Sequence, residues 1–238
     1  MFENLFRLVR MIGWDRISHA PIKLYRFRRD HLVGSLHRVA GFLPWYHQED
    51  YLRFVEDWQN LCSRQTRGKV VLEIGCGQGE EAERFLRMHG ASIVIASDIS
   101  PEMVEAAKLR DSRIIPLVAD ARSLPIRSGG VDVVYCSTLY HHIEEEERVK
   151  VLAESRRVSR EVVLLLDLFG FSNRLFDLLY ALYYRVIDGS ARRPTLEQWR
   201  QFLAHHILAE LHMPTDALAY RFCFYVVRSE ANDSERAT

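Results

Sequence analysis

The nine residues VLEIGCGQG, at positions 71–79, decide the fold. Residues 71–74 are typical of a short buried strand, and Gly75, Gly77 and Gly79 follow at alternate positions. Glycine lets the backbone turn sharply and lets a ligand come close to the main chain, while the start of a helix presents unpaired N–H groups. The stretch therefore predicts a strand, a ligand-binding turn and a helix, in that order.

Short apolar runs alternate with helical stretches on the carboxyl side of this turn, which is typical of βαβ units and a largely parallel sheet. Runs such as KVVLEI and EVVLLLD are apolar on both faces, as strands covered by helices on both sides must be. Between the strands the pattern predicts helices over 80–89, 101–109 and 144–158. We predict strands over 70–74, 93–97, 114–118, 131–135 and 162–167, with a late pair over 207–212 and 222–227.

Composition places the chain among ordinary globular proteins and excludes several classes. Of the 238 residues, 48% are hydrophobic and 27% charged, and 32 basic side chains balance 32 acidic ones. Such a balance gives no indication of a nucleic-acid partner. The four cysteines form no CxxC pair and no cluster at zinc spacing, so we expect neither a disulfide framework nor a metal site.

The spacing of the glycines distinguishes between two kinds of cofactor. Dinucleotide-binding turns favour GxGxxG, in which a third small residue lets helix and strand pack around a pyrophosphate. This chain reads GxGxG and has Glu80 where that small residue would stand. A carboxylate is unfavourable beside pyrophosphate but compatible with a ligand that carries positive charge. The acidic Glu73 before the turn points to the same conclusion.

With these features the sequence resembles the class I S-adenosylmethionine (AdoMet)-dependent methyltransferases over roughly residues 69–167. The resemblance implies a Rossmann-like, doubly wound α/β fold with a seven-stranded sheet and AdoMet as the cofactor. It also implies that the glycine motif contacts the methionine moiety, that an acid ending the second strand accepts the ribose hydroxyls, and that the next residue packs on adenine. The cofactor residues expected on this basis are Glu73, Gly75, Cys76, Gly77, Gly79, Asp98, Ile99, Asp120, Ala121 and Cys136.

The fourth predicted strand runs into CSTLYHH, residues 136–142, similar to a segment that lines the methyl-transfer site in the small-molecule branch of this family. Methyl transfer needs alignment and a dry pocket, and it needs a base only if the acceptor must lose a proton. His141 and His142 are therefore the candidate catalytic residues. The alternative is that one of them only positions the following helix.

The segment after the fifth strand is expected to form a helical insertion, about residues 169–206, that shapes the acceptor pocket. Residues 169–187 are rich in Phe and Tyr with hardly any polar face, so they must be buried, cover a ligand or meet a partner. We therefore expect a partly apolar or aromatic acceptor. The candidate acceptor contacts are Tyr140, Tyr180, Tyr183 and Arg192, although an exposed basic loop is the simpler reading of the arginine.

Residues 1–68 are expected to form an N-terminal helical cap, because apolar residues recur in it at helical spacing. Its first 40 residues carry eight basic and three acidic side chains, which permits peripheral contact with an anionic membrane or a lipid-like acceptor. No apolar run reaches the length of a membrane span, so we expect a cytoplasmic or membrane-peripheral protein. Residues 69–228 are expected to form the AdoMet-binding domain and residues 229–238 a disordered tail.

These observations favour AdoMet-dependent methylation of a small molecule, with oxygen ranked before carbon and nitrogen as the acceptor atom. Two alternatives stay open at this point. One is an NAD-type oxidoreductase on a similar fold, which Glu80 disfavours. The other is a non-catalytic partner protein with the AdoMet-binding fold, which the intact glycine motif disfavours. A small-molecule acceptor is the partner that we expect, and the oligomeric state stays undetermined.

Overall fold

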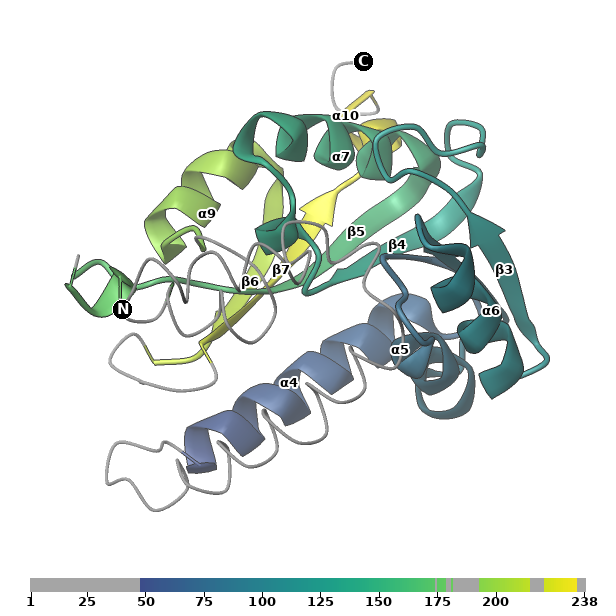
Figure 1. Cartoon of the computed structure of the whole chain (residues 1–238), viewed down its shortest axis with the longest axis horizontal. Coiled ribbons are helices and arrows are strands. Elements are labelled where there is room, and N and C mark those ends of the chain that lie inside the picture. The colour runs from purple at the N-terminus through teal and green to yellow at the C-terminus, as the bar shows by residue number, and fades with distance from the viewer. Residues whose placement is uncertain (1–47, 174, 179–180, 182–192, 215–220, 235–238) are drawn as a thin grey trace, which may run out of the picture.

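The computed structural model describes residues 48–173, 175–178, 181, 193–214 and 221–234. In this part of the chain, seven strands form one sheet in the order β3-β2-β1-β4-β5-β7-β6 (Figure 1). The first five strands are parallel, and β7 runs antiparallel to both β5 and β6. The strands are β1 (Val70–Ile74), β2 (Ile93–Asp98), β3 (Ile114–Val118), β4 (Val131–Ser137), β5 (Ser159–Leu168), β6 (Ile207–His212) and β7 (Phe222–Arg228).

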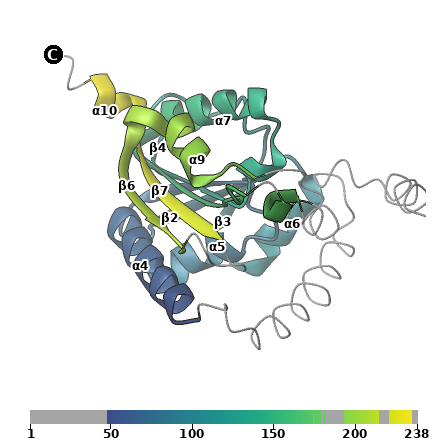
Figure 2. The same ribbon diagram turned by 90° about the vertical axis from the view of Figure 1, so that its left-hand side faces the viewer.

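Helices cover both faces of this sheet, which confirms the predicted doubly wound α/β fold. Helices α4, α5 and α6 lie on one face, whereas α7 and α9 lie on the other, as two perpendicular views show (Figures 1 and 2). A short helix, α10, follows the last strand. The bounds are α4 (Gln48–Thr66), α5 (Glu80–Arg84), α6 (Pro101–Arg110), α7 (Glu145–Val158), α9 (Leu196–Leu203) and α10 (Glu230–Ser234).

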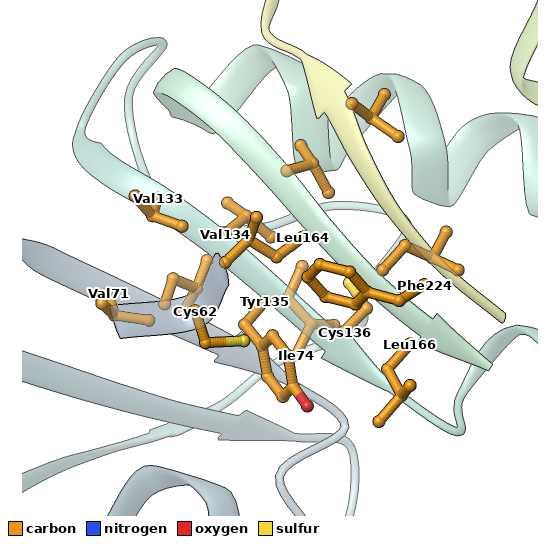
Figure 3. Packing of buried hydrophobic residues seen from close by; sticks show 14 of the residues in the cluster. Cys62, Val71, Ile74, Val133, Val134, Tyr135, Cys136, Leu164, Leu166 and Phe224 are labelled. Carbon is orange, nitrogen blue, oxygen red and sulfur yellow. The ribbon is translucent and has the colours of Figure 1, made fainter. Parts of the chain in front are cut away.

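The core joins the helices to the central strands. The largest fully buried side chains include Trp199 of α9, Tyr135 of β4 and Phe85, which follows α5. Figure 3 shows Cys62 of α4 close to Tyr135 of β4 in the buried hydrophobic cluster. Helix α4 lies within the segment expected to form the N-terminal helical cap and packs on the sheet, whereas residues 1–47 of that segment lie outside the described residues.

Two local differences from the predicted elements have physical reasons. The predicted helix over 80–89 is α5 followed by a π-helical turn over Phe85–His89, which brings His89 Nδ1 to 2.8 Å from Ser63 Oγ of α4. The expected disordered tail instead begins with α10. Ser229 is buried and its hydroxyl donates to the carbonyl of Arg160, while the Asn232 side chain donates to that of Glu161.

Two helix starts follow their sequence signals. The Ser100 side chain accepts from the amide of Met103 at the start of α6, with Pro101 at the first helical position. Thr195 caps α9 in a capping box with Gln198. Within the described ranges, no helix is long and apolar enough to cross a membrane. The same ranges contain no group of three or more metal-binding side chains placed to hold an ion.

Candidate functional site

The predicted site residues gather at the carboxyl ends of the parallel strands. The strand order reverses between β1 and β4, so the connections after these strands lead to helices on opposite faces of the sheet (Figure 1). Ligands of open α/β sheets bind at such a switch point. The glycine turn follows β1, the acid of the second strand ends β2, and the histidine segment follows β4.

Each glycine of the turn has a different role. All three have positive φ, which side chains other than glycine rarely adopt. A Cβ at Gly79 would lie 2.7 Å from that of Ala107, so this glycine lets α6 pack against the turn. A Cβ at Gly75 would lie 3.0 Å from the side chain of Leu139, which follows β4. A Cβ at Gly77 would meet nothing within 4 Å, so this position faces open space.

Glu73, the last but one residue of β1, is a buried carboxylate with an unused acceptor. Its side-chain oxygen Oε2 has no hydrogen-bond partner among the described residues, and neither has Ser97 Oγ in the adjacent strand. Burial raises the pKa of Glu73 well above its usual value, and the nearby carboxylate of Glu81 raises it further. An unpaired buried carboxylate is costly, so this one is suited to a cationic ligand.

Asp98 ends β2, as predicted, and is tied to the glycine turn. The amide of Gly77 donates to Asp98 Oδ2 at 3.0 Å, and the amide of Ser100 donates to Oδ1 at 2.9 Å. Burial raises the pKa of Asp98, although these amides oppose the shift. The next residue, Ile99, keeps 45% of its surface exposed, so an apolar surface lies beside the fixed carboxylate.

Asp120 follows β3 and is held by a neighbour that the sequence analysis did not identify. Arg122 donates from Nε and Nη2 to the Asp120 carboxylate, with a shortest distance of 2.6 Å, and this hydrogen bonding lowers the pKa of Asp120. Arg122 also reaches Glu147 in α7 at 3.1 Å. The carboxylate is thus ionised and fixed, with Ala121 partly buried beside it.

The two cysteines expected near the cofactor are both buried. Cys76 lies in the glycine turn, and burial raises the pKa of its thiol. Cys136 lies near the end of β4 and is 1% exposed, with its thiol pKa raised by burial to about 12. Both side chains are therefore neutral thiols at physiological pH, which suits shape-filling contacts rather than nucleophilic chemistry.

The chain leaves β4 through a strained residue. Thr138 has a φ of 49°, in the left-handed region that threonine rarely adopts, and its amide donates to the carbonyl of Leu166 at 2.7 Å. This turn directs Leu139 onto Gly75, which joins the histidine segment to the glycine turn. Tyr140, expected to contact the acceptor, is instead fully buried with its ring against Trp199 and Phe202. We therefore assign Tyr140 to the core.

His141 and His142 lie in a 3-10 turn (Tyr140–His142) instead of opening helix α7. His141 Nδ1 lies 2.5 Å from Oδ1 of Asp167, the penultimate residue of β5, and both side chains are almost fully buried. The ring of His142 is exposed and lies 4.0 Å from that of His141, centroid to centroid. Asp167 is the partner that the sequence analysis missed, although an acid at a strand end on this edge was a usable signal.

Part of the expected acceptor side lies within the described residues, whereas Tyr180, Tyr183 and Arg192 lie outside them. At the end of β5 the guanidinium of Arg221 lies over the rings of Phe169 and Phe171, at 4.3 and 3.8 Å, and donates to the Gly170 carbonyl. Leu175, Phe176 and Leu178 in the helical residues 175–178 are 63%, 48% and 63% exposed. An apolar surface is therefore present in the predicted insertion.

The residues at the switch point fit the expected cofactor. The orphan oxygen of Glu73 offers an acceptor for an ammonium group, and Gly77 opens onto space that a side chain would otherwise fill. Asp98 is a fixed carboxylate with an apolar neighbour, as a ribose followed by adenine requires. The site thus combines acidic groups with apolar surface.

Comparison with known proteins agrees with this geometry. Residues 71–161 match a family model described as a methyltransferase domain. The mouse protein "tRNA (carboxymethyluridine(34)-5-O)-methyltransferase ALKBH8" is 33% identical over 60% of this chain and 20% of its own length. The "Ubiquinone/menaquinone biosynthesis C-methyltransferase UbiE" of Vibrio vulnificus is 29% identical over 71% of this chain and 60% of its own length.

The fold also matches solved structures. Magnesium protoporphyrin IX methyltransferase from Synechocystis, solved with bound SAH, has a TM-score of 0.56 at 18% identity, over 87% of this chain and 98% of that one. At this identity the likeness concerns the fold alone. The chain spans about a fifth to a third of the length of the first curated relatives that it matches.

Proposed function

Because the chain belongs to the class I S-adenosylmethionine-dependent methyltransferases, we propose that it transfers the AdoMet methyl group to a small, partly apolar acceptor. This family carries out methyl transfer, so the NAD-type oxidoreductase alternative is no longer favoured. The single observation that carries the proposal is the bond from the Gly77 amide to Asp98 Oδ2, which unites the glycine turn and the ribose-binding acid in one preformed site.

In this proposal the residues of the chain bind and orient, while AdoMet, when bound, supplies an already activated methyl group on its sulfonium. Glu73 and the backbone around Gly77 hold the methionine end. Asp98 accepts from the ribose hydroxyls with Ile99 on the adenine ring, and Asp120 accepts from the adenine amino group. The remaining cofactor contacts proposed are Gly75, Cys76, Gly79, Ala121 and Cys136.

Two observations support a small and partly apolar acceptor. The predicted insertion carries exposed apolar side chains at Leu175, Phe176 and Leu178. One relative, UbiE, is named as a C-methyltransferase of ubiquinone and menaquinone biosynthesis, which is a small-molecule pathway. We propose Tyr180 and Tyr183 as further acceptor contacts, with Arg192 available for an anionic group on the acceptor. Oxygen remains the first choice of acceptor atom.

Relatives named as tRNA methyltransferases define the second acceptor class to be tested. The purified protein would be incubated with tritiated AdoMet and either a small-molecule extract or bulk tRNA from the source cells. We expect label to appear in the small-molecule fraction. Label in tRNA alone would contradict the proposed acceptor while leaving methyl transfer intact, and label in neither fraction would contradict the catalytic role.

A further inference from the structure

A buried carboxylate and a histidine form a pair beside the proposed methyl-transfer site. We propose that Asp167 is a positioning residue that holds His141 with its proton on Nδ1, so that Nε2 receives the proton of a hydroxyl or amine acceptor. This inference rests on the proposed methyl transfer and deepens it, because it restricts the acceptor to groups that lose a proton when they are methylated.

The geometry fixes both partners. Asp167 Oδ1 receives the amide of Leu168 at 2.6 Å and lies 2.5 Å from His141 Nδ1, while Oδ2 receives the amide of Tyr140 at 2.8 Å. Two backbone donors therefore prevent the carboxylate from rotating away from the ring. With the proton on Nδ1 and directed at a carboxylate, Nε2 on the opposite side of the neutral imidazole carries the lone pair that accepts a proton.

The charges around Asp167 favour its ionised form. The titratable groups that face it are His141 and His142 in the turn after β4, Arg148 of α7, Cys136 of β4, Cys223 of β7 and the phenol of Tyr140. Burial alone would raise the pKa of Asp167, but the hydrogen bonds from His141 and the Leu168 amide, together with the positive charge that His141 and His142 carry when protonated, outweigh it, and the pKa is lowered. A buried anion beside Nδ1 stabilises the imidazolium that proton uptake at Nε2 creates.

His141 is better placed for this role than His142. The side chain of His141 is 2% exposed, whereas the ring of His142 is exposed to solvent. Leu139, two residues earlier, touches the Gly75 position of the glycine turn, so the segment that carries His141 borders the proposed cofactor site. A base whose ring is held in one orientation directs its proton transfer to the acceptor.

The proposed reaction moves one methyl group and one proton. The attacking oxygen or nitrogen of the acceptor forms its bond to the methyl carbon as the carbon–sulfur bond breaks, and the electron pair of that bond stays on sulfur. The proton of the acceptor passes to His141 Nε2, which leaves a methylated acceptor and an imidazolium paired with Asp167. Loss of that proton to solvent restores the neutral ring.

The first test is spectroscopic and needs no acceptor. In protein labelled with 15N-histidine, the tautomer of His141 is observed with AdoMet bound, and the His141→Asn variant identifies its signals. His212 is an internal standard, because its Nδ1 lies 2.9 Å from the Met213 carbonyl and must therefore donate. We expect His141 to match His212, with the proton on Nδ1. A proton resident on Nε2 in the neutral ring would overturn the assignment.

The second test separates a base from a merely structural histidine. In His141→Asn the amide can still donate to Asp167 but the nitrogen corresponding to Nε2 is gone. We expect calorimetric AdoMet affinity within about threefold of wild type and tritium transfer to the small-molecule extract reduced by roughly 100-fold or more. Asp167→Asn should lower the transfer and shift the His141 tautomer, since an amide N–H can donate to Nδ1.

The outcomes of this test distinguish the two proposals. If His141→Asn folds, binds AdoMet and transfers tritium at a rate within about threefold of wild type, His141 is not the base, but the proposed methyl transfer is not contradicted. If the wild type binds no AdoMet or labels nothing, the proposed function itself falls. Should Asp167→Asn not fold, the wild-type tautomer and the His141→Asn transfer rate still decide the assignment.

Discussion

One residue in the proposed site, Glu73, lowers the stability of the ligand-free protein and is suited to ligand binding. Glu73 is a buried carboxylate with one unpaired oxygen, and its raised pKa means that the folded protein resists its ionisation. A raised carboxyl pKa costs stability increasingly as the pH rises above the unfolded value and costs nothing well below it. A cationic ligand that pairs with this oxygen would relieve the cost.

We therefore predict that Glu73→Gln stabilises the ligand-free protein and weakens AdoMet binding. The free energy of unfolding, measured with urea at about pH 8, should rise by about 1 kcal/mol or more, and the gain should shrink toward about pH 4.5. Calorimetry should show at least about tenfold weaker AdoMet binding. Glu105→Gln, which removes an exposed carboxylate of α6, is the control and should change neither quantity. A destabilised Glu73→Gln protein with normal affinity would contradict this account.

Asp98 should contribute through hydrogen bonds to the ribose. Asp98→Ala is predicted to weaken AdoMet binding by roughly 2 to 3 kcal/mol, because charged hydrogen bonds contribute about 1.5 to 3 kcal/mol each and do not add fully. The variant also removes the acceptor of the Gly77 amide, so its fold should be checked by circular dichroism. An unchanged affinity in the folded variant would remove Asp98 from the site.

At the scale of elements, helix α9 packs on the sheet and carries none of the proposed cofactor contacts. Its capping box pairs the Thr195 side chain with the Gln198 amide, and Trp199 is fully buried against the sheet. Thr195→Ala should lower the free energy of unfolding by about 1 kcal/mol, as loss of a helix cap does. Urea unfolding would measure this loss, and AdoMet affinity should not change. A large loss of affinity would mean that α9 shapes the cofactor site directly.

The elements were largely predictable because their signals are local. Strands β1, β3 and β6 match the predicted ranges, and the side chains of Ser100 and Thr195 cap the starts of α6 and α9. The π-helical turn over Phe85–His89 was not predictable, since it depends on packing against α4. Helix α10 was missed for a similar reason, because its side chains bond to the backbone of β5.

Site residues were predictable where a strand end and a motif coincide, as at Glu73 and Asp98. The partners of two other site residues were not predicted. Arg122 lies only two residues from Asp120, but no motif marks this pair. Asp167 lies near the end of a strand, as Glu73 and Asp98 do, but its pairing with His141 joins segments that are 26 residues apart. The position of Tyr140 beside the histidines does not reveal that its ring is buried against Trp199.

At the scale of the whole molecule, the sheet order brings the loops of five parallel strands to one edge, with acids on several of them. Central strands and helices on both faces make this edge rigid, which suits a reaction that depends on alignment. The central claim is that the ligand occupies the open space at Gly77. Gly129 provides a matched control, since it also has a positive φ and a Cβ added there would meet nothing within 4 Å, but it lies in the loop before β4.

The most direct measurement is calorimetric titration of wild type, Gly77→Val and Gly129→Val with AdoMet. Both substitutions impose a similar backbone strain, at φ values of 51° and 59°, so a difference between them reports on the site and not on stability. We predict that the wild type and Gly129→Val bind AdoMet with similar affinity, whereas a folded Gly77→Val shows no detectable binding. Equal binding by both folded variants would contradict the account.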